Sequence, residues 1–322
     1  MSQFTRHVAS LLMGIAVAIP CAQAAYPDRP IHVIVPFAAG SAPDVVARLF
    51  ADRLSPRLGV PMVVDNVPGA GGTMGVDRVA KAAPDGYTLV LSGDAALVLA
   101  GANPVQPPYA PLKDLVPISQ LVITPNVLLV NKEMRARTLG ELLALVRTRP
   151  GAFNCAHLGA GTSSQRACDL LAQAVGSELV QVPYNHSPFP DVVAGRVQIF
   201  FGNIATAMPL VREGQLKALA VSSLQRAPMV PELPTMDEAG MPGFDVVAWF
   251  GLLAPVGTPE AVVQRLYGET QQVLADAALH VRLLQLGVLP TGTSPQAFSE
   301  LLKRETKRWS NAAASGVPNQ PR

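Results

Sequence analysis

Apolar and polar residues alternate in blocks along this chain, and the first block introduces a pattern that returns later. Residues 31–35 are β-branched and apolar apart from one histidine, which predicts a buried strand, whereas residues 45–50 are apolar at helical spacing. Between them, Ser41 and Asp44 have the spacing of a capping box, which predicts that a helix begins there. The N-terminus of a helix suits carboxylates or phosphates because it offers unpaired backbone N–H groups. An ordinary strand-to-helix turn would leave the same pattern.

Two further strands of this kind predict a parallel sheet. Residues 61–65 and 87–91 have strand composition, and a helical segment near residues 74–83 separates them. Strands that alternate with helices pair in parallel, and ligands bind beyond the carboxyl ends of such strands. One edge of the sheet should therefore carry the loop at Ser41, the loop at Asn66, and the segment Ser92, Gly93 and Asp94.

The pattern of strand, small-residue loop and capped helix returns in the middle of the chain. A strand over residues 153–156 runs into a glycine-containing loop, and Thr162 with Gln165 forms a second capping box. Other boxes occur, but only those at Ser41 and Thr162 follow a strand through such a loop. If the second box marks its own domain, two helix N-termini face each other across a cleft. Two later strand ends carry Tyr184 and Asn203.

Composition and the N-terminus narrow the class of protein. The 322 residues suffice for two domains, and a formal charge of +2 gives no reason to expect nucleic acid or an anionic membrane as a partner. Arg6 and His7 precede an apolar run over residues 8–19, and residues 22–24 have the A-x-A form of a signal-peptidase site. We therefore predict that residues 1–25 are a cleavable signal peptide and that the mature protein is periplasmic.

The mature chain lacks the residue patterns that catalysis or metal binding requires. It contains no G-x-S-x-G motif, and Ser163 and Ser164 have only distant histidines as bases, so a secreted hydrolase is the weaker alternative to a binding protein. Histidine and cysteine do not cluster at metal-ligand spacing. We expect no catalytic residue, no metal and no cofactor. Cys155 and Cys168 could pair in an oxidising compartment, but we favour two separate buried thiols.

A series of motifs, in a fixed order from residue 26 onward, resembles one known family. The motifs are Val35-Pro36-Phe37 with Gly40 and Asp44, Asn66 with residues 68–72, residues 83–88, residues 125–127, Gly161-Thr162-Ser163, residues 182–184, Pro234-Thr235 with residues 238–240, and residues 249–252. The chain thereby resembles the substrate-binding proteins of tripartite tricarboxylate transporters, the Bug family. The resemblance implies a two-domain α/β fold of the type II periplasmic-binding class, with two crossing hinge strands, that closes like a Venus flytrap on a small carboxylate, and in some members on an amino acid or aromatic acid.

The resemblance also implies how ligand is held. The loops at residues 37–44 and 161–163 should grip it from opposite domains through backbone N–H groups, hydroxyls and waters. Gly202 stands where the family commonly has a carboxylate, which would make the cleft roomier or more tolerant of a second anionic group. Asp94 would instead favour an amino group on the ligand. The sequence leaves both alternatives open.

These arguments define the expected domains, site and partners. We expect domain 1 over residues 26–125, domain 2 over 126–228, and a return to domain 1 over 229–322. The expected ligand-binding residues are Phe37, Ala38, Gly40, Ser41, Asp44, Ser92, Gly93, Asp94, Gly161, Thr162, Ser163, Ser164, Tyr184 and Asn203. The expected partners are a small carboxylate and the membrane permease of a tripartite transporter, or alternatively a sensor kinase, and the protein should be a monomer.

Overall fold

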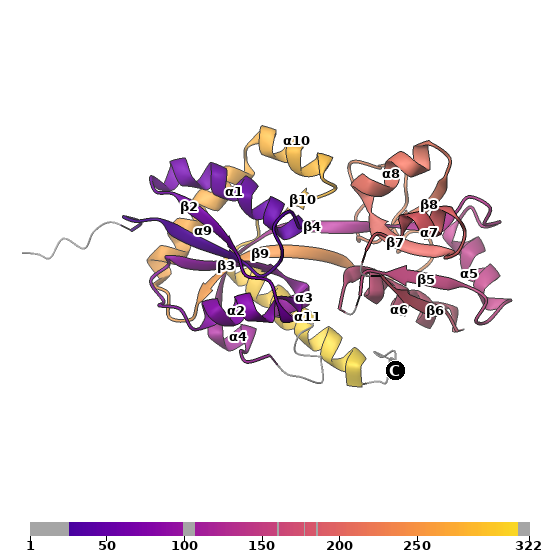
Figure 1. Ribbon diagram of the computed structural model, residues 1–322, viewed down its shortest axis with the longest axis horizontal. Coiled ribbons are helices and arrows are strands. Elements are labelled where there is room, and N and C mark those ends of the chain that lie inside the picture. The colour runs from indigo at the N-terminus through magenta and orange to yellow at the C-terminus, as the bar shows by residue number, and fades with distance from the viewer. Residues whose placement is uncertain (1–25, 99–106, 160, 177, 185, 315–322) are drawn as a thin grey trace, which may run out of the picture.

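A computed structural model describes residues 26–98, 107–159, 161–176, 178–184 and 186–314. The molecule has two halves, joined by strands that run from one to the other (Figure 1). The predicted signal peptide lies outside the described residues. Within those residues, no helix combines the length and the hydrophobicity needed to cross a bilayer.

The first half is built on parallel strands that alternate with helices, as the sequence predicts. In chain order its elements are β1 (Ile31–Val35), α1 (Ala42–Leu58), β2 (Met62–Asn66), η1 (Ala70–Gly72), α2 (Thr73–Ala80), β3 (Thr88–Gly93), α3 (Asp94–Leu97) and α4 (Pro111–Asp114). Strand β1 pairs in parallel with both β2 and β3, so the loops that follow these strands share one edge. The buried apolar side chains of β1 and β3 alternate between two core clusters, one on each face of the sheet.

The C-terminal part of the chain completes the first half. Strand β9 (Val247–Pro255) pairs antiparallel with β3. The helices that follow are α9 (Glu260–Leu274), α10 (Ala277–Gln285) and α11 (Pro295–Ala314). Side chains of α9 and α10 pack with α1 on one face, whereas α11 packs with α2 on the other (Figure 1).

Strand β4 (Leu115–Asn131) extends through both halves of the molecule. Residues 115–125 pair with β9, and residues 122–123 also pair with β10 (Leu289–Pro290), whereas residues 126–131 pair with strands of the second half. From the sequence, a strand is expected only over residues 127–130, because the many prolines of residues 102–117 favour an irregular connection. That prediction was wrong. It relied on the rule that proline is rare in central strands, and β4 contains prolines. Here an irregularity in the ladder with β9, between Pro117 and Ser119, accommodates one of them.

The second half repeats the plan of the first. Its elements are α5 (Leu139–Arg147), β5 (Asn154–His157), α6 (Ser163–Val175), β6 (Val180–Pro183), α7 (Phe189–Val193), β7 (Ile199–Asn203), α8 (Ile204–Arg212) and β8 (Leu216–Val221). Strand β5 pairs in parallel with β6 and β7, and β4 lies between β7 and β8. The loops after β5, β6 and β7 therefore share one edge.

The chain returns to the first half later than the sequence suggested. Met236, Met241, Phe244 and Val246 are buried in a core cluster of the second half, together with side chains of α5 and α6. Residues of the segment 229–246 therefore pack with the second half, whereas the sequence predicts a return to the first half at residue 229. Sequence placed it there because a proline-rich stretch resembles a linker, but these residues contribute apolar side chains to the core.

A buried serine joins the segments that meet where the chain passes between the halves. The Ser222 N–H donates to the Asn126 carbonyl at 2.9 Å, and the Asn126 N–H donates to the Ser222 hydroxyl at 2.9 Å. That hydroxyl donates in turn to the Val246 carbonyl at 2.6 Å, and the Val246 N–H donates to the Ser222 carbonyl. The two crossings, through β4 and into β9, are therefore held in register by the backbone and the hydroxyl of one residue.

Cys155 on β5 and Cys168 on α6 form a disulfide, with their Cα atoms 6.0 Å apart. The expectation of two separate thiols was wrong. Sequence spacing alone does not reveal whether a strand residue and a helix residue approach within disulfide range, which is usually about 4.4–6.8 Å between Cα atoms. The bond ties the helix to the strand on either side of the loop that joins them.

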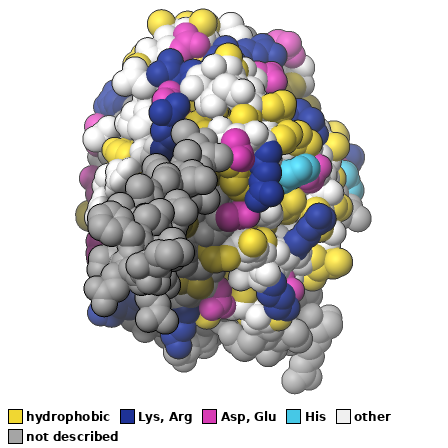
Figure 2. Space-filling view, turned by 90° about the vertical axis from the view of Figure 1, so that its left-hand side faces the viewer, with side chains coloured by type: hydrophobic (Ala, Val, Ile, Leu, Met, Phe, Trp, Pro, Cys, Tyr) yellow, Lys and Arg dark blue, Asp and Glu magenta, His cyan; other side chains and the backbone are white. Residues whose placement is uncertain are grey.

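The surface agrees with the low net charge. Figure 2 shows Lys, Arg, Asp and Glu side chains interspersed among apolar and neutral ones on the face formed by the end of the first half. The described side chains that are visible there do not form the continuous basic stripe that nucleic-acid binding proteins use.

Candidate ligand-binding site

The loop between β1 and α1 is organised around the buried carboxylate of Asp44. One of its oxygens accepts the Gly40 N–H at 2.8 Å, and the other accepts the Asn66 side-chain amide at 2.9 Å. Arg48 forms an ion pair with the same carboxylate, at 2.9 Å. Burial alone would raise the pKa of Asp44, but these hydrogen bonds together hold it below its usual value. Asp44 is thus engaged by protein groups and fixes the shape of the loop.

The predicted capping box at Ser41 does not form, because Asp44 accepts the N–H of Gly40 and not that of Ser41. Ser41 occupies the N-cap position of α1 with extended backbone, but its side chain caps no N–H group. Its hydroxyl oxygen is buried and has no hydrogen-bond partner among the described groups. The prediction for the hydroxyl was therefore wrong, since a capping box requires this oxygen to accept a backbone N–H. A buried hydroxyl without a partner is unusual in a native protein.

The loop between β5 and α6 has nearly the same backbone arrangement, and its capping hydroxyl is engaged. Thr162 accepts the Gln165 N–H at 3.3 Å, as the sequence predicts, whereas the Gln165 side chain accepts the N–H of Gly161, one residue before the N-cap, at 2.7 Å. In the first loop the matching bond runs from Gly40 to Asp44. Both glycines have φ near +80°, a conformation that glycine adopts without strain. Each loop therefore presents a glycine followed by the first turn of a helix.

The hydroxyls of the second loop are largely occupied by neighbouring groups. Thr162 donates to the Gly159 carbonyl at 2.8 Å, and Ser164 accepts the Leu158 N–H at 3.0 Å. Ser163 accepts the side-chain amide of Asn126, on β4, at 2.9 Å. In the part of the chain that the structure describes, neither serine is hydrogen-bonded to a histidine, so the arrangement does not resemble a nucleophile paired with a base.

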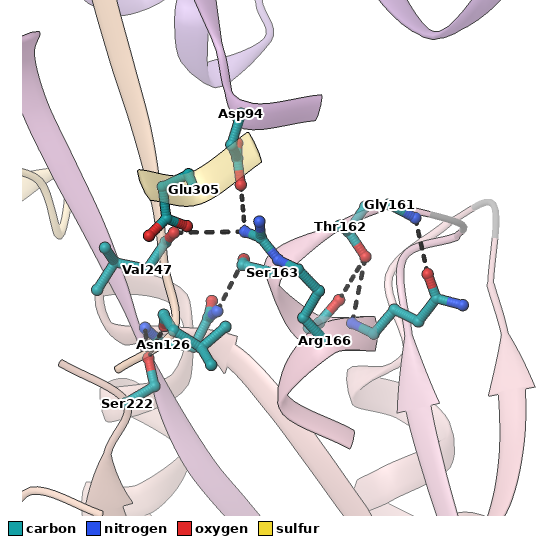
Figure 3. Close-up of polar contacts among 12 residues, drawn as sticks. Asp94, Asn126, Gly161, Thr162, Ser163, Arg166, Ser222, Val247 and Glu305 are labelled. Carbon is teal, nitrogen blue, oxygen red and sulfur yellow. Dashed lines mark hydrogen bonds and ion pairs between the residues drawn. The ribbon is translucent and has the colours of Figure 1, made fainter. Parts of the chain in front are cut away.

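The carboxyl end of β3 combines a close packing contact with a buried charge. A Cβ atom on Gly93 would lie 2.3 Å from the Trp249 carbonyl oxygen, so glycine is required there for β3 to pair with β9. Ser92 is fully buried, and its hydroxyl, like that of Ser41, has no partner among the described groups. Asp94 forms an ion pair with Arg166 of α6 (Figure 3). Asp94 is therefore already paired, and the expectation that it favours a ligand amino group loses its basis.

The first loop and the end of β3 meet at a glycine. A Cβ atom on Gly72 would lie 3.2 Å from the Phe37 ring and 3.1 Å from Ala96 of α3. The Phe37 carbonyl accepts the Asn66 side-chain amide, and the Ala38 carbonyl accepts the Ser41 N–H. The predicted residues of the first half thus form one connected group.

Tyr184 and Asn203 occupy the same edge of the second half, but their side chains are engaged elsewhere. The Tyr184 hydroxyl donates to Asp191 at 2.6 Å. Asn203 caps α8 by accepting the Ala205 N–H at 2.9 Å, and it lies close to Gly287 of the first half. Among the described residues, neither side chain is hydrogen-bonded to the two capped loops.

Gly202 does not create the extra room that the sequence suggested. A Cβ atom there would lie 2.8 Å from the Phe200 ring, 3.1 Å from Leu129 and 3.1 Å from the Phe189 ring. The position is closed by apolar side chains, so glycine at this site serves packing.

Contacts between the halves bring the second loop against the first half (Figure 3). The Asp94–Arg166 ion pair joins the first turn of α6 to the first half, and the Asn126–Ser163 hydrogen bond ties the same turn to β4, the strand that runs through both halves. Sequence analysis did not select Asn126, Asn66 or Arg166 as site residues. Asn66 and Asn126 lie within the family motifs, which could have indicated them, whereas no pattern in the sequence pointed to Arg166. Within the described part of the chain, no three acidic, histidine or cysteine side chains are grouped to hold a metal ion.

Comparison with known proteins decides the family. The model of the tripartite tricarboxylate transporter family receptor, TctC, matches residues 46–314. The chain belongs to this family. The receptor is 34% identical over 296 residues to Protein BugT of Bordetella pertussis, which covers 91% of each chain. The predicted resemblance to Bug proteins is thereby confirmed, and the protein is a periplasmic-type solute-binding receptor rather than an enzyme.

Two solved structures show what similar receptors hold. MatC from Rhodopseudomonas palustris with bound malate has a TM-score of 0.74 and 36% identity, covering 89% of this chain and all of that one. R. palustris Rpa4515 with adipate has a TM-score of 0.77 and 31% identity, covering 91% of this chain and 98% of that one. The periplasmic-binding fold predicted for the receptor is thus confirmed.

Proposed function

We propose that the receptor binds a small organic carboxylate between its two halves, as a monomer, and delivers it to the membrane permease of a tripartite transporter. The observation that carries this proposal is the pair of loops with matching geometry, one in each half, each ending in the first turn of a helix. The first N–H groups of a helix have no intrahelical acceptor, and anions are favoured there. Malate in MatC and adipate in Rpa4515 support the choice of ligand class.

Two loops are needed to account for useful affinity. A single helix N-terminus contributes about 0.3–2 kcal/mol to an anion, whereas micromolar binding requires about 8 kcal/mol. Hydrogen bonds to a charged group add roughly 1.5–3 kcal/mol each. The buried hydroxyls of Ser41 and Ser92, which have no partners among the described groups, are natural donors for such bonds or for bridging waters. Closure of both halves around one carboxylate therefore supplies the required free energy.

The first experiment identifies the ligand. Small molecules released by denaturing the natively purified mature receptor are analysed by mass spectrometry, and a stoichiometric organic acid is the expected result. Empty protein is then screened by thermal shift, because ligand at 100 times Kd should add about 2.7 kcal/mol of stability. An absence of any shift with mono-, di- and tricarboxylates would reject the proposed ligand class.

A pair of serine substitutions in α1 and its cap tests the location of the site. Ser41→Ala removes a hydroxyl that has no protein partner, so it should leave the melting temperature unchanged and weaken binding about tenfold, or ~1.4 kcal/mol. Ser55→Ala is the matched control, because the Ser55 hydroxyl donates to Ala51 and accepts the Met62 N–H. It should lower stability and preserve affinity. Equal affinity in both variants would place the ligand elsewhere.

A further inference from the structure

A buried ion pair joins two elements that belong to different halves of the receptor. Asp94 begins α3, at the end of β3 in the first half, and Arg166 lies in the first turn of α6 in the second half (Figure 3). Their side chains are only 7% and 5% exposed, and they form the ion pair directly. The same guanidinium also lies 3.4 Å from the Val247 carbonyl, at the start of β9. Few other charged groups in the described chain are so fully enclosed.

This contact differs in kind from the others between the halves. The Ser222 hydrogen bonds join segments at the crossings themselves, where a rotation of the halves moves atoms least. Asp94 and Arg166 are 72 residues apart and lie on elements that move with opposite halves. Separation of the halves therefore breaks the ion pair, whereas the bonds at the crossings can persist.

The surroundings make the pair sensitive to the loss of either member. Burial raises the pKa of Asp94, Arg166 opposes that rise, and Glu305 of α11 adds to it. When the receptor opens, water solvates both charges again. The free energy of an intact pair is therefore nearly the same in the open and the closed state. If only one member remains, the closed state must enclose a charge without its counterion, and the open state gains.

We propose that the Asp94–Arg166 ion pair is an interdomain clasp whose matched charges allow the ligand-free receptor to populate the closed arrangement. The closed arrangement is the one in which both capped loops meet the ligand, so the clasp also tunes affinity. Apparent Kd equals the intrinsic Kd divided by the closed fraction. This consequence for affinity rests on the proposed function, whereas the effect on shape does not.

The test uses Arg166→Gln, which leaves Asp94 enclosed near Glu305 without a cation. Small-angle X-ray scattering of the ligand-free mature receptor should show a larger radius of gyration for this variant than for wild type. Its apparent Kd for the carboxylate found in the wild-type protein should rise about tenfold, which corresponds to a tenfold fall in the closed fraction. Arg29→Gln is the matched control, because Arg29 pairs with the exposed Asp85 inside the first half. It should change neither quantity.

A double variant separates the clasp from other roles of Arg166. Asp94→Asn with Arg166→Gln removes both charges, so the radius of gyration and Kd should return toward the wild-type values. If Arg166 contacts the ligand directly, the shape recovers and the affinity does not, which would overturn the consequence for Kd. An unchanged radius in Arg166→Gln would overturn the clasp itself. If Arg166→Gln fails to fold, as judged by circular dichroism, the double variant is compared with Asp94→Asn instead. A double variant of wild-type shape beside an open Asp94→Asn supports the clasp, and an Asp94→Asn of wild-type shape overturns it. Because scattering uses ligand-free protein, it tests the clasp even if no carboxylate binds.

Discussion

Loss of the Cys155–Cys168 disulfide should destabilise the receptor by an amount that the loop length determines. The two cysteines are 13 residues apart. In the chain-entropy model, a cross-link that closes a loop of this size stabilises the folded protein by about 3 kcal/mol at 25 °C. Replacing both cysteines by alanine should therefore lower the free energy of unfolding by about that amount, and the melting temperature by on the order of 5–10 °C. The two cysteines flank the second capped loop, so the helix that follows it, α6, should become less stable as well.

The assay compares urea unfolding of the mature receptor, the receptor with reductant, and the double alanine variant. Reduced receptor and variant should share a lowered midpoint, and denatured untreated protein should contain no free thiol. Two free thiols per untreated chain, together with an unchanged midpoint in reductant, would refute the reasoning. A lowered midpoint for the variant alone would assign the loss to the cavities left by the side chains, since each sulfur is fully buried.

Two further changes test the packing around the candidate site. Asp44→Asn should destabilise the receptor most at neutral pH. A carboxyl whose pKa is lowered in the folded state contributes stability at a pH above its ordinary pKa, and this contribution is lost as the pH falls through the folded-state pKa. The stability difference from wild type, measured by urea unfolding, should therefore shrink below about pH 4, and a difference that stays constant with pH would contradict this assignment. Gly93→Ala should cost about 3 kcal/mol because its Cβ meets the Trp249 carbonyl at 2.3 Å, whereas Gly140→Ala, with nothing within 4 Å, should not lower the melting temperature.

The two capping boxes show how far sequence reasoning reaches. Both were predicted from the same spacing after a strand and a glycine, and both mark the start of a helix. Only Thr162 uses its hydroxyl as predicted, and the spacing of the first box also does not reveal that Arg48 and Asn66 engage the Asp44 carboxylate. Local spacing therefore located the loops, while contacts from distant residues set the role of each side chain.

Long-range pairing accounts for what the sequence did not predict. Hydrophobic patterning identified β1 and β3, since apolar residues predominate in both. The first part of β4 was missed because its ladder with β9 tolerates prolines through an irregular register. The Asp94–Arg166 pair joins residues whose nearness depends on how the two halves dock, and no local pattern encodes that.

The position of β9 between β3 and β4 has a consequence for the order in which the receptor is made. Synthesis begins with β1, β2 and β3, but the strand that joins β3 to β4 comes from residues 247–255, after the whole second half. Until that segment emerges from the ribosome, β3 and the first part of β4 each expose an edge that will later pair with β9. Exposed strand edges invite pairing with other chains. The nascent receptor therefore depends on late completion of its first sheet, and a chain truncated before β9 would keep those edges open.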